Sequence, residues 1–217
     1  MERGLLGALP EAERQAVRAS MVRKNYRRDE TLFHEGDPGD QLFAIEKGRV
    51  AIRMTTVLGD VVTLNLLGPA DTFGEQALLE AGARRTATAI ALEPVEVRTL
   101  HRDHFDELRR RHPAVDQLLV DLLATQVRRL SASLLEAMYM PVDRRVVRRL
   151  AELMNLYDGG STPVVVPLRQ EDLASMVGTT RPTLNRALRQ LADDGLIALG
   201  RGRVEIHDPI GLAARAR

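Results

Sequence analysis

The sequence of 217 residues contains no cysteine and no tryptophan, and only 3% of its residues are aromatic. The absence of cysteine excludes disulfides, thiol nucleophiles, thiolate zinc sites and cysteine-bound iron–sulfur clusters. The scarcity of aromatic side chains disfavours a single-strand binder that works by stacking on bases. No run approaches the roughly 18 apolar residues that a membrane-crossing helix needs.

The N-terminal segment lacks the pattern of a secretory signal, because Pro10 and then charged residues break its apolar stretch. With 44% apolar and 28% charged residues, the composition is that of an ordinary globular protein. We therefore expect a cytoplasmic protein with no membrane partner.

Basic residues gather toward the C-terminus. Residues 143–217 hold 12 arginines against 9 carboxylates, whereas the whole chain has a formal net charge of +1. This surplus is compatible with nucleic-acid binding, and an ordinary solvated surface explains it equally well. The charge alone therefore does not distinguish nucleic-acid binding from an ordinary solvated surface, and the motifs of that segment are needed.

Short runs rich in β-forming residues occupy the region 31–100. Gly and Pro separate the runs, and this spacing predicts an antiparallel sandwich or barrel. We expect short amphipathic helices on either side of it, at residues 11–21 and 101–111. The expected strands are residues 42–45, 50–54, 61–66, 87–92 and 95–97.

A long helix is predicted from about Pro113 to Met138, because no Gly or Pro interrupts this stretch. One apolar stripe has the alternating three- and four-residue spacing of a coiled-coil seam, which favours a homodimer. Leu119, Leu122 and Leu135 lie off this stripe and are expected to face the β domain. The alternative is that both stripes pack within one chain. The expected seam is Val120, Leu123, Val127, Leu130, Leu134 and Ala137.

Pro141 ends this helix, since proline cannot continue the backbone hydrogen bonding, and it marks a domain hinge. A helix at 144–156 and a strand at 164–166 are expected next. Residues 169–191 then read as two helices joined by a glycine-containing turn, the pattern of a helix-turn-helix.

Glycine and threonine are suited to the turn between the two helices of this motif. Gly178 is expected to take the positive φ that ends the first helix. Thr179 or Thr180 is expected to cap the second helix through its hydroxyl.

The second helix of the motif has an apolar back and a polar front on a helical wheel. Such a front suits the major groove, because Arg can pair with guanine and Asn with adenine. After it, residues 193–206 predict a hairpin around an Arg/Gly turn, whose arginines could touch phosphates. The alternative is a solvated helix face. The expected DNA-binding residues are Arg169, Gln170, Thr180, Arg181, Thr183, Asn185, Arg186, Arg189 and Arg201.

A possible anion site lies in the β region. Gly74 would let backbone approach a phosphate, Arg85 would offer a charge-assisted fork and Thr86 a hydroxyl, while Glu75 could accept a sugar hydroxyl. Glu75 and Arg85 could equally form a surface ion pair. The chain has no P-loop and no nucleophile beside a base, so we expect no enzyme activity and no metal site.

Segments 35–45, 48–50, 73–75 and 85–87 resemble the cyclic nucleotide-binding domain of the cAMP receptor protein (Crp-Fnr) family, and residues 169–191 resemble its DNA-binding motif. The resemblance implies an α+β fold: a β-roll (double-stranded β-helix) at 1–112, a dimerisation helix and hinge at 113–140, and a winged helix-turn-helix at 141–217. It also implies a homodimeric transcription regulator that binds a palindromic operator and RNA polymerase.

The resemblance further implies cAMP as an allosteric effector rather than a resident cofactor. Leu130 and Ser131 occupy the positions that contact the base in the family, and Leu130 replaces a polar residue there. A regulator that binds DNA without a nucleotide, or that responds to cGMP or a cyclic dinucleotide, is therefore the alternative. Pro182 replaces a base-reading glutamate, so the half-site is expected to differ. The implied ligand residues are Gly74, Glu75, Gln76, Ala77, Arg85, Thr86, Leu130 and Ser131.

Overall fold

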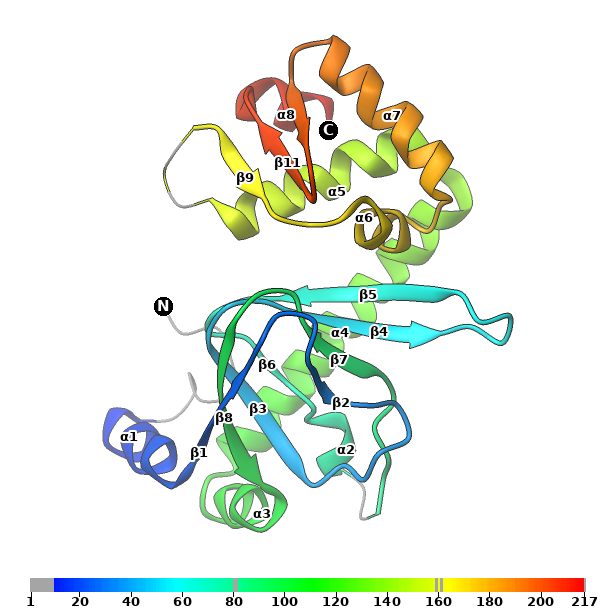
Figure 1. Ribbon diagram of the computed structural model, residues 1–217. Coiled ribbons are helices and arrows are strands. Elements are labelled where there is room, and N and C mark those ends of the chain that lie inside the picture. Colours follow the sequence, from blue (N-terminus) through cyan, green and yellow to red (C-terminus); the bar gives the residue numbers. More distant parts are fainter. Residues whose placement is uncertain (1–9, 80–81, 159, 161, 217) are drawn as a thin grey trace. The chain divides into compact units, whose positions relative to one another are not determined.

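The computed structural model describes residues 10–79, 82–158, 160 and 162–216. The chain forms two compact units, of which the first ends at Arg129 and the second begins at Leu130 (Figure 1).

Two four-stranded antiparallel sheets build the first unit, as the spacing of the β-rich runs predicts. One sheet has the strand order β1-β8-β3-β6 and the other β2-β7-β4-β5, the arrangement of a β-roll. The strands are β1 (Val22–Tyr26), β2 (Thr31–Phe33), β3 (Gln41–Lys47), β4 (Val50–Thr55), β5 (Val61–Leu67), β6 (Thr72–Phe73), β7 (Thr88–Ala91) and β8 (Val95–His101).

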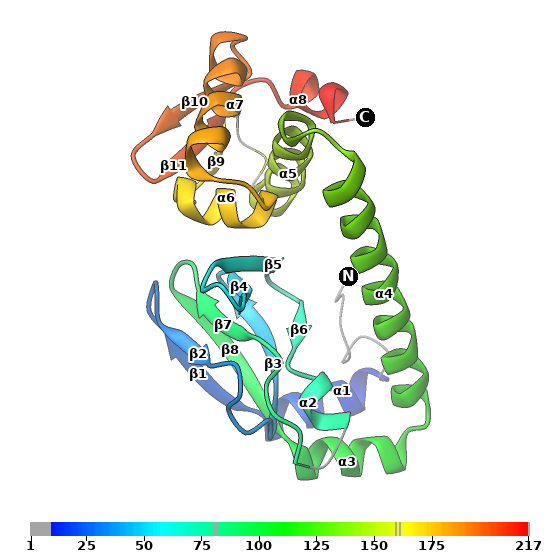
Figure 2. The same ribbon diagram turned by 90° about the vertical axis from the view of Figure 1, so that its right-hand side faces the viewer.

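Helices gather at the end of the first sheet where β3 begins and β8 ends (Figures 1 and 2). They are α1 (Glu11–Ser20), α2 (Gln76–Leu79), α3 (Arg102–Arg111) and the start of α4 (Ala114–Tyr139). Their apolar faces share one core, because each buries only a stripe of its surface. That core contains Met21, Leu42, Leu78, Leu100, Phe105, Leu108, Val115 and Leu119.

Helix α4 has one apolar side in this core and another in contact with solvent. Leu119 is buried and Leu122 packs partly against the same core, as predicted. Leu135 belongs to the second unit and is 58% exposed, so its expected contact with the β domain stays a prediction.

The second unit is built around α5 (Val142–Tyr157), which begins directly after Pro141, two residues before the predicted start at residue 144. A three-stranded sheet of order β10-β11-β9 and three further helices pack with it. The remaining elements are β9 (Val164–Val166), α6 (Gln170–Val177), α7 (Arg181–Asp193), β10 (Ile197–Gly200), β11 (Arg203–Ile206) and α8 (Pro209–Arg215).

Candidate functional site

Arg85 places a positive charge inside the β domain. Its side chain is only 5% exposed, and its Nη1 and Nη2 donate to the carbonyl oxygens of Gly74 and Gln41 at 3.0 and 2.7 Å. Its guanidinium carbon lies 4.3 Å from the ring centroid of Phe33 and 5.4 Å from that of Phe43. Burial lowers the pKa of Arg85, but an arginine stays protonated in a protein. The domain therefore holds a fixed cation, as an anion-binding site requires.

Gly74 is the residue that lets the backbone come so close to this cation. Its φ is +84°, and a Cβ built there would lie 2.7 Å from Nη1 of Arg85. A side chain at this position would both strain the backbone and displace the guanidinium. The requirement for glycine is thus explained by the geometry.

Glu75 follows Gly74, which forms a cradle with Arg85, and one oxygen of the Glu75 carboxylate has no partner among the described residues. Its Oε2 is buried and receives no hydrogen bond from the described residues. Burial raises the pKa of Glu75, and its own backbone N–H and the charge of Arg85 oppose the rise. Leaving a buried acceptor unpaired costs free energy. A hydroxyl donated by a ligand would remove that cost.

The other predicted ligand residues of this domain lie in the same place. The Thr86 hydroxyl donates to Oε1 of Gln76 at 3.2 Å, which joins the segment before β7 to the first residue of α2. Ala77, the next residue of α2, is buried. Leu130 and Ser131 belong to the other unit, where both are exposed, and their part in ligand binding stays a prediction.

Three phenylalanines around Arg85 were not predicted as part of the site. The rings of Phe33, Phe43 and Phe73 have centroids 5.1–5.9 Å apart. Phe33 and Phe43 lie within cation–π distance of the guanidinium, and Phe73 stacks on Phe43. Their alternation in the strands indicates burial, but nothing in the sequence links them to Arg85.

We expect Glu75→Gln to stabilise the ligand-free protein at neutral pH. Since the pKa is raised in the folded state, the carboxylate destabilises the fold above its unfolded pKa, and the penalty disappears as the pH falls below that value. Removing it is worth on the order of 1 kcal/mol, or about 2–4 °C in Tm for a chain of this size. Thermal melts at pH 7.5 and pH 4 test this; equal Tm differences at both pH values would contradict it.

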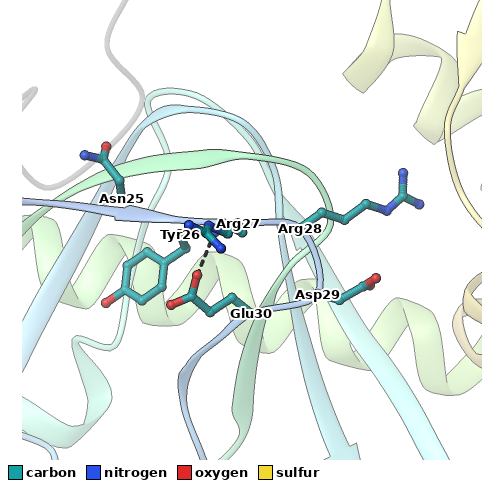
Figure 3. A pocket seen from close by; sticks show the side chains of 6 residues that line it. All are labelled: Asn25, Tyr26, Arg27, Arg28, Asp29 and Glu30. Carbon is teal, nitrogen blue, oxygen red and sulfur yellow. Dashed lines mark hydrogen bonds between the residues drawn. The ribbon is translucent and has the colours of Figure 1, made fainter.

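A second hollow of the β domain contains none of the cradle residues. It has a volume of about 670 Å³ and is lined by residues 25–30 of β1 and the following turn. Figure 3 shows the backbone N–H of Arg27 bonded to Glu30, while Arg28 extends away from that pair. This hollow is open, and we do not treat it as a candidate ligand site. Its arginines instead provide control positions for substitutions in the cradle.

The second unit contains the predicted helix-turn-helix. Gly178 ends α6 with φ of +66°, which confirms its predicted role. Thr180 precedes α7 as its N-cap residue, but the prediction that its hydroxyl caps the backbone is wrong. The hydroxyl instead donates to the hydroxyl of Thr183 at 3.1 Å.

The two faces of α7 differ as the helical wheel predicts. Leu184, Ala187, Leu188 and Leu191 are buried in the core of the unit. The opposite face forms an open hollow of about 630 Å³. That hollow is lined by Arg181, Pro182, Asn185, Arg186, Arg189, Gln190 and Asp193.

Several of these polar groups are available for a partner. Arg186 and Arg189 are exposed, and Oδ1 of Asn185 is buried without a partner among the described residues. Arg181 is 59% exposed and its Nη1 lies 3.2 Å from Oε1 of Glu171 on α6. A guanidinium and amide surface of this kind matches the donor and acceptor pattern of a major groove.

The remaining predicted DNA contacts lie at the ends of neighbouring elements. Arg169 is the exposed N-cap of α6, and Gln170 is the first residue of that helix. Arg201 is exposed at the turn of the β10–β11 hairpin, where Gly202 has φ of +71°. This hairpin is the predicted wing.

None of the helices in the described residues combines the length and the hydropathy needed to cross a bilayer.

Two domain families match the chain: the cyclic nucleotide-binding domain at residues 23–112 and the Crp-like helix-turn-helix domain at residues 144–215. A CRP-like cAMP-activated global transcriptional regulator of Mycobacterium tuberculosis is 34% identical over 196 residues, which cover 89% of this chain and 87% of that protein. The cyclic AMP receptor protein of Thermus thermophilus is 35% identical over 186 residues, which cover 86% and 84%.

The crystal structure of the Thermus thermophilus catabolite activator protein is 32% identical, with a TM-score of 0.56 over 98% of this chain and 97% of that chain. A β-roll with a buried arginine cradle and a winged helix-turn-helix define a DNA-binding transcriptional regulator with a cyclic nucleotide-binding domain. The chain belongs to the Crp-Fnr family of transcriptional regulators.

Proposed function

We propose that this protein is a homodimeric, sequence-specific regulator whose DNA binding is controlled by a cyclic nucleotide, with cAMP as the effector. The observation that carries the proposal is the buried pair of unsatisfied groups in the cradle. The Arg85 guanidinium has an unpartnered Nε and Glu75 an unpartnered Oε2 among the described residues. A cyclic phosphate and a ribose hydroxyl have the complementary chemistry, an anion for the first and a donor for the second.

The names of the relatives support cAMP in particular. One is described as cAMP-activated and another as a cyclic AMP receptor protein, at 34% and 35% identity. Leu130 favours the second candidate, a regulator that binds DNA without a nucleotide or answers to cGMP or a cyclic dinucleotide. An apolar side chain there cannot hydrogen-bond a base edge.

Dimerisation is proposed from the exposed stripe of α4. Val120, Val127, Leu130 and Leu134 are each at least half exposed, and together they repeat along the predicted seam. Apolar residues repeated at this spacing are buried by a second helix in a coiled coil. A two-fold dimer would also match a palindromic operator.

We also propose RNA polymerase as a partner, because a regulator of this family implies it. The proposed compartment is the cytoplasm, because DNA and polymerase meet there.

The direct test is a titration of a labelled palindromic duplex with and without cAMP, paired with calorimetry of cAMP, cGMP and cyclic dinucleotides. A ligand that prefers the DNA-binding conformation raises DNA affinity, and DNA must raise the affinity for the ligand by the same factor. Equal DNA affinity with and without every nucleotide would contradict ligand control.

We expect Arg181→Ala to relax specificity at one base pair of each half-site. A bidentate contact to guanine is worth about 1–3 kcal/mol of discrimination. Binding to operators with each base pair replaced in turn measures this effect, and a non-specific duplex at low salt is the control. Uniform weakening on all duplexes would instead identify Arg181 as a phosphate contact.

A further inference from the structure

Arg102, the first residue of α3, is hydrogen-bonded to α2, the helix that contains the proposed ligand residues Gln76 and Ala77. Its Nη1 donates to the carbonyl of Leu78 at 2.9 Å, and its Nη2 donates to the carbonyls of Ala77 at 2.5 Å and Gly39 at 2.9 Å. Its backbone N–H donates to the carbonyl of Asp40 at 2.8 Å. One partly buried side chain therefore joins α2, the turn before β3 and α3.

The helix that Arg102 holds is too short to be stable by its own hydrogen bonds. Helix α2 has four residues, Gln76–Leu79, and the last carbonyls of any helix lack intrahelical partners. Charge-assisted donors are stronger than neutral ones, so Arg102 supplies much of what fixes the end of α2. The segment it fixes starts one residue after Glu75.

Close backbone packing also joins α2 to the turn before β3. A Cβ on Gly39 would lie 2.1 Å from the Cβ of Ala77, so the turn and α2 touch with no spare room. The backbone N–H of Gly39 also donates to the carbonyl of Ala83 at 3.1 Å, in the segment that leads to Arg85. A displacement of α2 must therefore move this turn as well.

Apolar packing continues the connection to α4. Leu78 of α2 is 1% exposed and shares a core with Phe105 of α3 and with Val115 and Leu119 of α4. Closely packed side chains transmit displacement, since interiors have few voids. The same helix α4 then continues to Tyr139.

We propose that Arg102 is the positioning residue that makes α2 and α3 move as one body, so that ligand binding at Gly74–Ala77 is passed to α4. This inference rests on the proposed function. A ligand that binds one position of α2 more tightly shifts the population toward it. Without Arg102, α2 adjusts to the ligand while α3 stays where it was.

The test uses the full chain with Arg102→Met, with Arg102→Lys as the conservative variant. Arg110→Met is the matched control, because Arg110 is an exposed arginine of the same helix. Hydrogen exchange of the ligand-free protein is measured for peptides covering residues 76–79 and 102–108. Calorimetry gives the Kd for cAMP, and a duplex titration gives the increase in DNA affinity that cAMP causes.

In Arg102→Met we expect exchange in α2 to become at least about tenfold faster, while cAMP still binds. The cAMP-induced increase in DNA affinity should fall at least about tenfold, with part of it restored in Arg102→Lys. Arg110→Met should match the wild type in every measurement.

An undiminished cAMP effect on DNA affinity in Arg102→Met would overturn the proposal. If the wild type itself binds no cAMP, the proposed function fails, and hydrogen exchange still decides the role of Arg102. Unchanged protection of α2 in Arg102→Met would then refute it.

Discussion

Replacing Arg85 with alanine is expected to weaken cyclic nucleotide binding by at least about thirtyfold. Removing one member of a buried, hydrogen-bonded charge pair costs about 2–5 kcal/mol, and each 1.4 kcal/mol is about tenfold in Kd. Among the described residues of the cradle, Arg85 is the only buried cation that the phosphate could contact. Arg84, next in sequence, is exposed and donates to the carbonyl of Gly36. Calorimetry with cAMP measures the loss.

The same variant separates ligand binding from DNA binding. The carbonyls of Gly74 and Gln41 would lose their donors, so a lower Tm of the β domain accompanies the change. Non-specific DNA binding should persist, because the residues proposed to contact DNA phosphates lie in the other unit. Arg28→Ala, which removes an exposed arginine of the same domain (Figure 3), is the control. Retained cAMP response in Arg85→Ala would refute the assigned pocket.

Leu134→Asp is expected to convert the proposed dimer to a monomer. Leu134 is 61% exposed in the single chain, and in the proposed seam it would be covered by the second helix. A carboxylate there would be buried twice in each symmetric dimer. At about 2–3 kcal/mol per copy, the dissociation constant should rise about a thousandfold or more. Sedimentation equilibrium measures it directly.

Affinity for a full palindrome should fall with the dimer, while affinity for a single half-site should change little. Ser133→Asp is the matched control, because Ser133 is exposed on the same helix, adjacent in sequence and outside the seam. A Leu134→Asp protein that sediments as a dimer would show that this stripe is not the interface.

The long helix could be predicted because no Gly or Pro interrupts it, and the helix-turn-helix because the periodicity of its apolar residues reports burial. The apolar positions of α7 recur once per turn, and the four buried side chains are those the wheel selects. Helix α2 could not be predicted, since four residues span barely one helical period. Strand β1 was missed because most of its residues are polar, and β2 and β6 because they have only three and two residues.

Only part of the cradle could be predicted from the sequence, and the reason differs from the one that applies to the short helix and strands. Arg85 and Glu75 were found through a local motif, and the structure brings Arg85 onto the Gly74 carbonyl. The role of Arg102 depends on contacts with residues 24 to 63 positions away. Such long-range hydrogen bonds leave no periodic signal in the sequence.

The narrow space at Gly74 also bears on how such regulators diversify. Since a Cβ there would lie only 2.7 Å from Nη1 of Arg85, a single substitution is expected to disable the proposed ligand site while the helix-turn-helix unit stays intact. Loss of the proposed response would then need only one evolutionary step. Gly74 is the position at which to look for that step among paralogues.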